Sequence, residues 1–218
     1  MTLLRKRGAT FAAVAFVVLS SGCASAYYGA LEQLGIEKRD ILVDRIDDAR
    51  DAQADAKEQF ATALERYRSV VTFDGGDLEK TYDRLNREYE RSEDRAQVVR
   101  DRIDSVEAVA DDLFAEWEDE LDEYADPELR RRSARLLSET RTQYREVLAA
   151  MHRAEQSMDP VLALFRDQVL FLRHNLNARA VASLESELDA IERATSALLV
   201  DMQNSIDEAS AFIQAMEP

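Results

Sequence analysis

The side chains best suited to chemistry in this sequence are two histidines and a large excess of carboxylates. His152 and Glu155 lie three residues apart, so they share one face if this segment is a helix. A di-iron site in a helical bundle needs Glu-x-x-His on two helices and a glutamate on each of two others. Here the order is reversed, the sequence holds no second copy, and His174 lies at an expected turn. We therefore expect no metal in the protein core and no bound cofactor.

The sequence contains none of the short motifs that typically carry catalysis. It lacks Gly-x-Ser-x-Gly, a glycine-rich phosphate loop and His-Glu-x-x-His. The single cysteine, Cys23, stands at the end of an apolar segment, where lipid attachment explains it better than nucleophilic chemistry. The sequence therefore predicts a protein without enzymatic activity.

Carboxylates crowd one stretch that we expect to be the end of a helix. The four candidate cation ligands there are Glu116, Asp119, Glu120 and Glu123. Negative charge opposes the dipole at a helix C-terminus, and like charges one turn apart destabilise a helix by roughly a few tenths of a kcal/mol. The first interpretation is a solvated face of an acidic protein. The alternative is weak association of Ca²⁺ or Mg²⁺, which would reduce both penalties, although no EF-hand-type loop is present.

The first 22 residues have the features of an export signal. Arg5, Lys6 and Arg7 precede an apolar run over residues 9–19, and small residues follow that run. About eleven helical residues rise roughly 16 Å, which is too short to cross a hydrocarbon core about 30 Å thick. We therefore interpret residues 1–22 as a signal peptide rather than a membrane helix.

Cys23 follows this signal directly and resembles the acylated cysteine of bacterial lipoproteins. Ser20 departs from that resemblance, because leucine is commonest three positions before the cysteine. The alternative is cleavage after Ala26, which would remove Cys23. With lipidation, residues 23–35 form the attachment site and a short tether, and Ala24 favours the outer membrane. We expect a periplasmic protein that is anchored to the outer membrane by lipidated Cys23.

The composition excludes several kinds of partner and fold. The formal net charge is −16, and removal of the three signal cations makes it −19 for the mature chain. Such a body repels phosphate backbones, so we expect no nucleic-acid partner. Hydrophobic residues make up 46% of the chain, which is enough for a core. Glycine and proline are too scarce for a β-sandwich or a doubly wound fold.

From Leu42 onward, apolar or small residues recur at alternating spacings of four and three. This is the heptad pattern of a coiled-coil seam, and it recurs in the second and fourth of four successive segments. The third segment contains two four-four steps, so its mean period is closer to that of a straight helix. The sequence predicts an all-α fold, an elongated antiparallel four-helix bundle of coiled-coil type. The expected helices, in a single domain over residues 36–218, are 36–73, 78–124, 127–175 and 178–216. The first seam comprises Leu42, Ile46, Ala49, Gln53, Ala56, Phe60, Ala63, Tyr67 and Val70.

The third of these helices has two candidate ends. Pro160 removes a backbone donor and clashes with the preceding turn, so the helix could stop there. Ending the helix near Asn175 instead gives helices of similar length, which suits an up-down-up-down bundle. We favour the second option, in which the seam of this helix runs from Leu129 through Leu136 to Leu172.

Residues 161–172 are apolar over more than one helix face. Leu164, Leu170 and Phe171 lie off the seam. In the first interpretation, this segment belongs to the central helix of the bundle, which contacts two or three neighbours. In the second, the three side chains form an exposed surface for a partner or for a second copy of the chain.

Two stretches of the sequence resemble a known family. Residues 35–53 begin Gly-Ile-Glu-Lys-Arg-Asp-Ile-Leu-Val, and residues 165–178 read Phe-Arg-Asp-Gln-Val-Leu-Phe-Leu-Arg-His-Asn-Leu-Asn-Ala. There the chain is similar to domain-of-unknown-function family 2959, coiled-coil envelope lipoproteins of Gram-negative bacteria. The resemblance covers essentially the whole mature chain. It implies a lipoprotein with a coiled-coil body, and it implies no activity.

The expected function is that of a lipid-anchored periplasmic coiled-coil protein with a structural or adaptor role in the cell envelope. Its expected partners are the membrane, through the N-terminal lipid, an unidentified envelope protein, and a second copy of itself. One alternative is a periplasmic holdase chaperone, which should show an apolar cavity. The other is a membrane-associated scaffolding coiled coil, which should carry a basic face that the sequence does not reveal.

Overall fold

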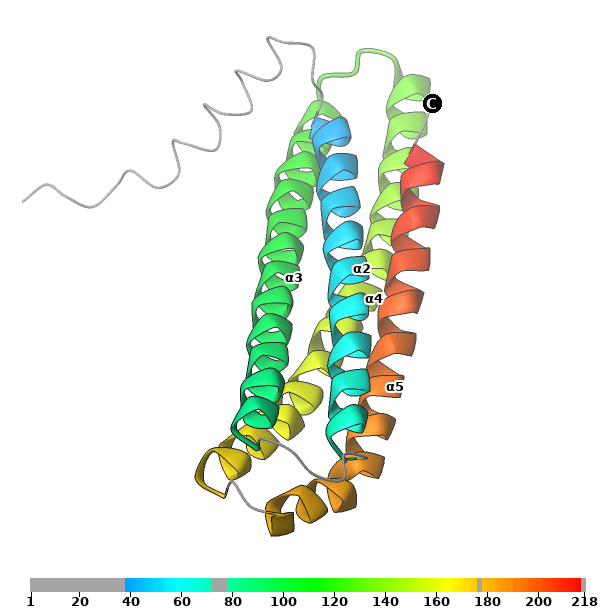
Figure 1. Cartoon of the computed structure of the whole chain (residues 1–218). Coiled ribbons are helices and arrows are strands. Elements are labelled where there is room, and N and C mark those ends of the chain that lie inside the picture. The colour runs from blue at the N-terminus through cyan, green and yellow to red at the C-terminus, as the bar shows by residue number, and fades with distance from the viewer. Residues whose placement is uncertain (1–37, 72–77, 176–177, 217–218) are drawn as a thin grey trace, which may run out of the picture. The chain divides into compact units, whose positions relative to one another are not determined.

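The computed structural model describes residues 38–71, 78–175 and 178–216. The chain divides into the units Met1–Glu37 and Lys38–Pro218, and the described residues all belong to the second. This unit, called the bundle below, consists of α2 (Lys38–Val71), α3 (Leu78–Glu120), α4 (Pro127–His174) and α5 (Ala178–Met216). Figure 1 shows the four helices side by side, and the described residues contain no strand. The predicted all-α bundle is confirmed.

Each helix of the bundle packs against the two that adjoin it in a ring. α2 and α4 both contact α3 and α5. Lys38, at the start of α2, pairs with Glu116 near the end of α3, with Nζ and Oε2 2.8 Å apart. Arg68, near the end of α2, pairs with Glu192 in the first half of α5, with Nε and Oε1 2.6 Å apart. Neighbouring helices therefore run antiparallel, in up-down-up-down order.

The residues of the first predicted seam are those that α2 packs into the core. All nine of its positions, from Leu42 to Val70, are buried. Burial of each large apolar side chain contributes roughly 1.5–3 kcal/mol, so this seam is a main source of stability. Gln53 differs from the rest, because its amide is completely buried and neither Nε2 nor Oε1 has a hydrogen-bond partner.

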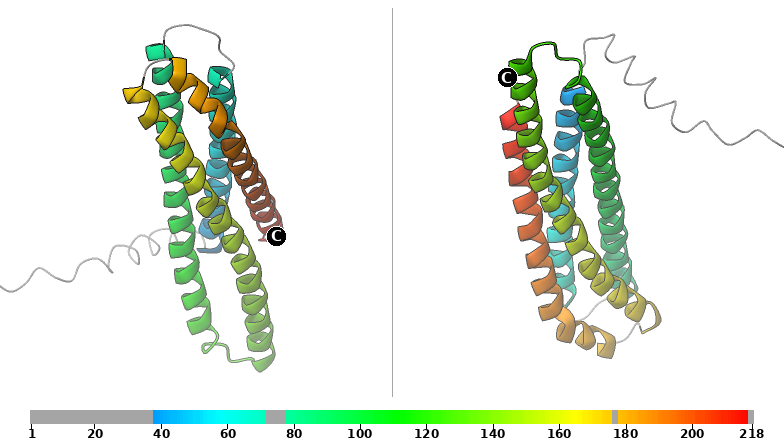
Figure 2. Two further views of the ribbon diagram at one scale, coloured as in Figure 1. Left: turned by 90° about the horizontal axis from the view of Figure 1, so that it is seen from below. Right: turned by 180° about the vertical axis from the view of Figure 1, so that it is seen from behind.

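α4 continues through Pro160 to its end at His174, as the favoured option expects. Its start is well capped, because the Asp126 side chain accepts a hydrogen bond from the Glu128 backbone N–H at 2.7 Å. Pro127 occupies the first turn, where a missing N–H leaves no intrahelical bond unmade. Figure 2 shows that α4 is inclined to α3 rather than parallel to it.

The predicted seam is wrong at Leu129 and Leu136 in the first turns of α4, which are 48% and 54% exposed. Ser133, which also belongs to the predicted seam, is buried, and so is Leu137, which does not belong to it. α4 has 48 residues and α5 has 39, and Figure 1 shows the red end of α5 stopping short of the start of α4. The face that the spacing directs toward α5 has no α5 turn opposite it there. These turns lean on α3 instead, where Trp117 Nε1 donates to Ser133 Oγ at 2.7 Å.

α3 ends at Glu120, earlier than the predicted end at residue 124. The next three backbone N–H groups, of residues 121–123, each donate to the carbonyl three positions earlier, which makes a tight turn. The last turn of α3 contains no basic residue. Its carboxylates face the negative end of the helix dipole, so the helix gives way early to the turn.

Candidate functional site

The proposed lipid site at Cys23 lies outside the described residues, as does the tether over residues 23–35. The cleavage alternatives before Cys23 and after Ala26 lie outside them too. None of the described helices combines the length and the apolar character needed to cross a membrane. Membrane attachment through the N-terminus therefore stays a prediction.

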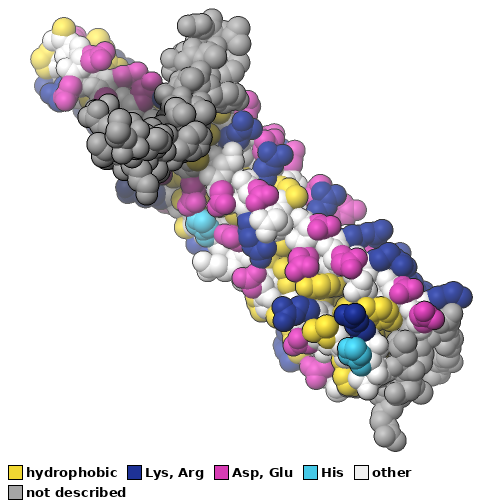
Figure 3. Space-filling model, turned by 90° about the vertical axis from the view of Figure 1, so that its left-hand side faces the viewer, with side chains coloured by type: hydrophobic (Ala, Val, Ile, Leu, Met, Phe, Trp, Pro, Cys, Tyr) yellow, Lys and Arg dark blue, Asp and Glu magenta, His cyan; other side chains and the backbone are white. Residues whose placement is uncertain are grey.

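Two of the three side chains predicted as a partner surface are exposed. Leu170 is 44% exposed and Phe171 is 40% exposed, while Leu164 is half-buried. The interpretation of these residues as core is wrong for Leu170 and Phe171, because the side of α4 that carries them faces away from its neighbours. Figure 3 shows hydrophobic side chains exposed among charged ones on one face of the bundle. We call Leu164, Leu170 and Phe171 the α4 patch.

The structure does not assemble the four candidate cation ligands into a site. Glu116 pairs with Lys38, with Oε2 and Nζ 2.8 Å apart. Asp119, Glu120 and Glu123 are exposed. Over the described parts of the chain, no group of three His, Cys, Asp or Glu side chains could hold a metal ion. The solvated-face interpretation fits this arrangement, and the cation-site alternative does not.

A groove of about 410 Å³ lies between α3 and α4. Phe114 and Tyr144 meet there edge to face, with ring centroids 5.3 Å apart. The Arg141 guanidinium lies 5.0 Å from the Phe114 centroid and also pairs with Glu118, which lowers the pKa of that carboxyl. The groove thus combines aromatic surface with charges of both signs. It is lined by Asp111, Phe114, Ala115, Glu118, Arg141, Tyr144 and Arg145.

The Tyr144 phenol at this groove keeps its proton. Burial raises the pKa of Tyr144, and the negative charges of Glu107 and Asp111 raise it further. A protonated phenol can still donate a hydrogen bond. The groove can therefore contact a partner surface of mixed apolar and polar character.

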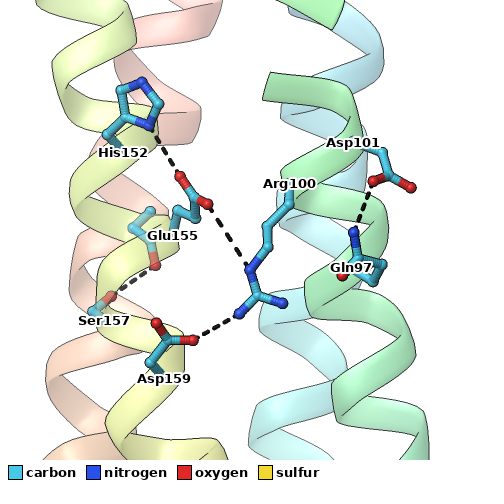
Figure 4. A network of polar contacts seen from close by, with 8 residues as sticks. Gln97, Arg100, Asp101, His152, Glu155, Ser157 and Asp159 are labelled. Atoms are coloured by element: carbon cyan, nitrogen blue, oxygen red, sulfur yellow. Dashed lines mark hydrogen bonds and ion pairs between the residues drawn. The ribbon is translucent and has the colours of Figure 1, made fainter. Parts of the chain in front are cut away.

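A polar cluster joins α3 to α4 farther along the interface between these two helices. His152 Nε2 lies 3.0 Å from Glu107 Oε1 on α3, and its Nδ1 lies 2.9 Å from Glu155 Oε2 on α4. Arg100 on α3 places Nη2 2.7 Å from Asp159 Oδ1 and Nε 3.9 Å from Glu155 Oε1. Figure 4 shows the chain of contacts from His152 through Glu155 and Arg100 to Asp159. We call these five residues the His152 cluster.

The charge on His152 follows from its surroundings. Burial lowers the pKa of His152, but the hydrogen bonds to Glu155 and Glu107 and the charges of both raise it, and the net shift is upward. The sequence drew attention to His152 and Glu155 only as metal ligands. Glu107 and Arg100 were missed because they lie on another helix. The antiparallel pairing of the second and third heptad segments is the signal that could have placed them opposite His152.

A family model described as "Protein of unknown function (DUF2959)" matches residues 27–216, a range that includes every described residue. No curated protein matches the chain. The match agrees with the resemblance seen in the sequence.

Proposed function

The chain belongs to the DUF2959 family, whose description assigns no activity, and we propose that it is a lipid-anchored spacer of the cell envelope. In this proposal the protein is a non-catalytic, periplasmic structural or adaptor protein. Its N-terminal lipid holds it to the outer membrane, and its bundle presents a contact surface to another envelope protein.

The sequence before α2 supports the anchor. Cys23 follows a signal-like segment, and α2 begins at Lys38. About fifteen residues separate the two, and fully extended they span at most roughly 50 Å. A lipid on Cys23 would therefore keep the start of α2 close to the membrane surface.

The observation that carries the spacer proposal is the position of the α4 patch along the bundle. At the end where α2 begins, the Arg39 guanidinium donates to the Met216 carbonyl. Leu170 and Phe171 lie at the opposite end, in the last turns of α4. The 34 residues of α2 rise about 50 Å between these two ends. The bundle thus holds two exposed apolar side chains about 50 Å from the point where the chain enters it.

A photo-crosslinking residue placed at position 171 in growing cells tests the proposal. The matched control is position 200, because Val200 is 59% exposed on α5 and lies outside the patch. We expect a discrete adduct from position 171, identified by mass spectrometry as an envelope protein, and none from position 200. Equal adducts from both positions, or none from either, would remove the support for an adaptor role of this end.

One observation favours a second candidate, a membrane-associated scaffold. Leu129, Arg132 and Leu136 share one exposed face at the start of α4, and Arg135 is exposed beside them. This short basic and apolar segment lies at the end of the bundle where α2 begins. Sedimentation of the Cys23→Ser chain with phosphatidylglycerol vesicles would detect it, and an Arg132→Glu, Arg135→Glu variant should lose the binding. The spacer proposal expects no binding of the unlipidated chain to such vesicles.

A further inference from the structure

The His152 cluster places one imidazole between carboxylates of two different helices. Nε2 faces Glu107 of α3 at 3.0 Å, and Nδ1 faces Glu155 of α4 at 2.9 Å. An ionised carboxylate only accepts hydrogen bonds, so each contact needs a proton on the ring nitrogen that faces it. A neutral imidazole carries one such proton. Both contacts are therefore satisfied together only by the imidazolium form.

We propose that His152 is a proton-operated latch between α3 and α4. As an imidazolium it donates hydrogen bonds to both Glu107 and Glu155 across the interface between α3 and α4. As a neutral ring it donates to one carboxylate and turns a lone pair toward the other. Deprotonation therefore breaks one of the two hydrogen bonds of His152. The two carboxylates then face each other with like charges, and the contact between α3 and α4 weakens near His152.

Among the residues that the structure describes, no other positive group near the ring compensates for the positive charge that His152 loses on deprotonation. Glu107 is the charged group that faces His152 from α3, and Glu155 faces it from α4. α5 packs on the other side of α4, and none of its described side chains makes a charged contact with His152. Arg100 is directed to Asp159 at 2.7 Å and reaches Glu155 only at 3.9 Å. Without the imidazolium, the cluster has three carboxylates and one guanidinium.

The direction of the pH response follows from this environment. Burial lowers the pKa of His152, yet its two carboxylate partners raise it more, so it lies above the ordinary value of 6.5. The stabilisation is complete below the ordinary value and is lost as the pH rises through the higher value of the folded protein. Every unit by which folding raises this pKa is about a tenfold change in the folding equilibrium.

The groove beside Phe114 lies at the same interface between α3 and α4, so we expect the protonation state of His152 to affect its structure. Glu107 is one helical turn from Asp111, and both charges act on the Tyr144 phenol. Loss of the hydrogen bond to Glu107 therefore releases the turn of α3 that precedes the groove.

Amide hydrogen exchange of the full chain in detergent tests the latch, with the wild type and His152→Gln compared at equal pH. At pH 6 we expect several-fold slower exchange in the wild type over residues 103–111 and 148–156, because the imidazolium holds the seam. At pH 9 the two proteins should exchange alike. Residues 42–56 of α2 serve as the internal control and should not differ between the two proteins at either pH.

Two further measurements keep the test decisive if His152→Gln folds poorly. Glu107→Gln removes one of the two carboxylates that His152 contacts and should likewise abolish the pH-dependent difference. The chain has only two histidines, so proton NMR of the wild type can follow the titration of His152 directly. We expect the midpoint of this titration at a pH above 6.5. A midpoint at or below 6.5, or equal exchange of the wild type and both variants at pH 6, would overturn the proposal.

Discussion

Gln53 occupies a seam position that heptad spacing would give to an apolar side chain. Its amide is completely buried between the helices and has no hydrogen-bond partner. An unsatisfied buried polar group costs roughly 1–3 kcal/mol. Polar residues at such positions of coiled coils fix the register of the helices at the expense of stability. Gln53 therefore lowers the stability of the bundle at one position of an otherwise apolar or small-residue seam.

Replacing Gln53 by leucine should stabilise the bundle. The change removes the unsatisfied amide and fills a core position with an apolar side chain, so we expect a gain of about 1–3 kcal/mol and a melting temperature higher by roughly 2–12 °C. Thermal unfolding followed by circular dichroism measures it. Gln59→Leu is the matched control on the same helix, because Gln59 Nε2 donates to Glu88 Oε2 at 3.0 Å and its loss should not stabilise. An unchanged or lower melting temperature for Gln53→Leu would contradict this account.

Phe171 and Phe165 should respond oppositely to substitution. Phe165 is 5% exposed and its ring lies 6.2 Å from that of Tyr67, so Phe165→Ala should cost about 3–5 kcal/mol through the cavity it leaves. Phe171 is 40% exposed, so Phe171→Asp should change stability by only about 0.5 kcal/mol. Urea unfolding of both variants measures the difference. A large loss for Phe171→Asp would mean that the patch is covered within the bundle.

The sequence alone could not decide the exposure of Phe171. Its spacing shows that the residue lies off the seam, but an off-seam apolar side chain is buried or exposed according to whether a further helix lies beside it. That depends on the arrangement of all four helices. The same limit applies to Glu107, whose contact with His152 joins positions 45 residues apart.

The helices themselves were predictable, because heptad spacing and caps are local signals. Asp126-Pro127 marks the start of α4, and apolar residues at spacings of three and four run along each helix. The faces at the start of α4 were not predictable in the same way. Heptad spacing tells which face of a helix suits a neighbour, but the burial of Leu129 and Leu136 depends on where α5 ends.

Removal of the Asp126 cap should weaken α4. The carboxylate accepts the Glu128 N–H at 2.7 Å and stands at the positive end of the helix dipole, so Asp126→Ala should cost about 0.5–2 kcal/mol. Urea unfolding detects this as a lower midpoint with an unchanged slope. Glu123→Ala, in the exposed turn before α4, is the control and should leave the midpoint in place. Equal midpoints for Asp126→Ala and the wild type would show that proline alone starts the helix.

At the scale of the whole chain, we predict that Cys23 determines the position of the protein in the cell. Cys23→Ser should abolish acylation, and the protein should then move from the membrane fraction to the soluble periplasmic fraction. Intact-mass analysis of the wild type should find an acylated Cys23 at the mature N-terminus. A mature N-terminus at Tyr27 would end the lipoprotein prediction, although the bundle and its α4 patch would stand.

The contact between Arg39 and the Met216 carbonyl has a practical consequence for anyone who labels this protein. An even number of antiparallel helices returns the chain to the end at which it entered the bundle. A fluorescent protein fused after residue 218 would therefore lie beside the start of α2, where the proposed lipid anchor would act. The opposite end would be free of this bulk. A reporter inserted between α2 and α3 would reverse the situation, so the pair of fusions separates defects of anchoring from defects of partner contact.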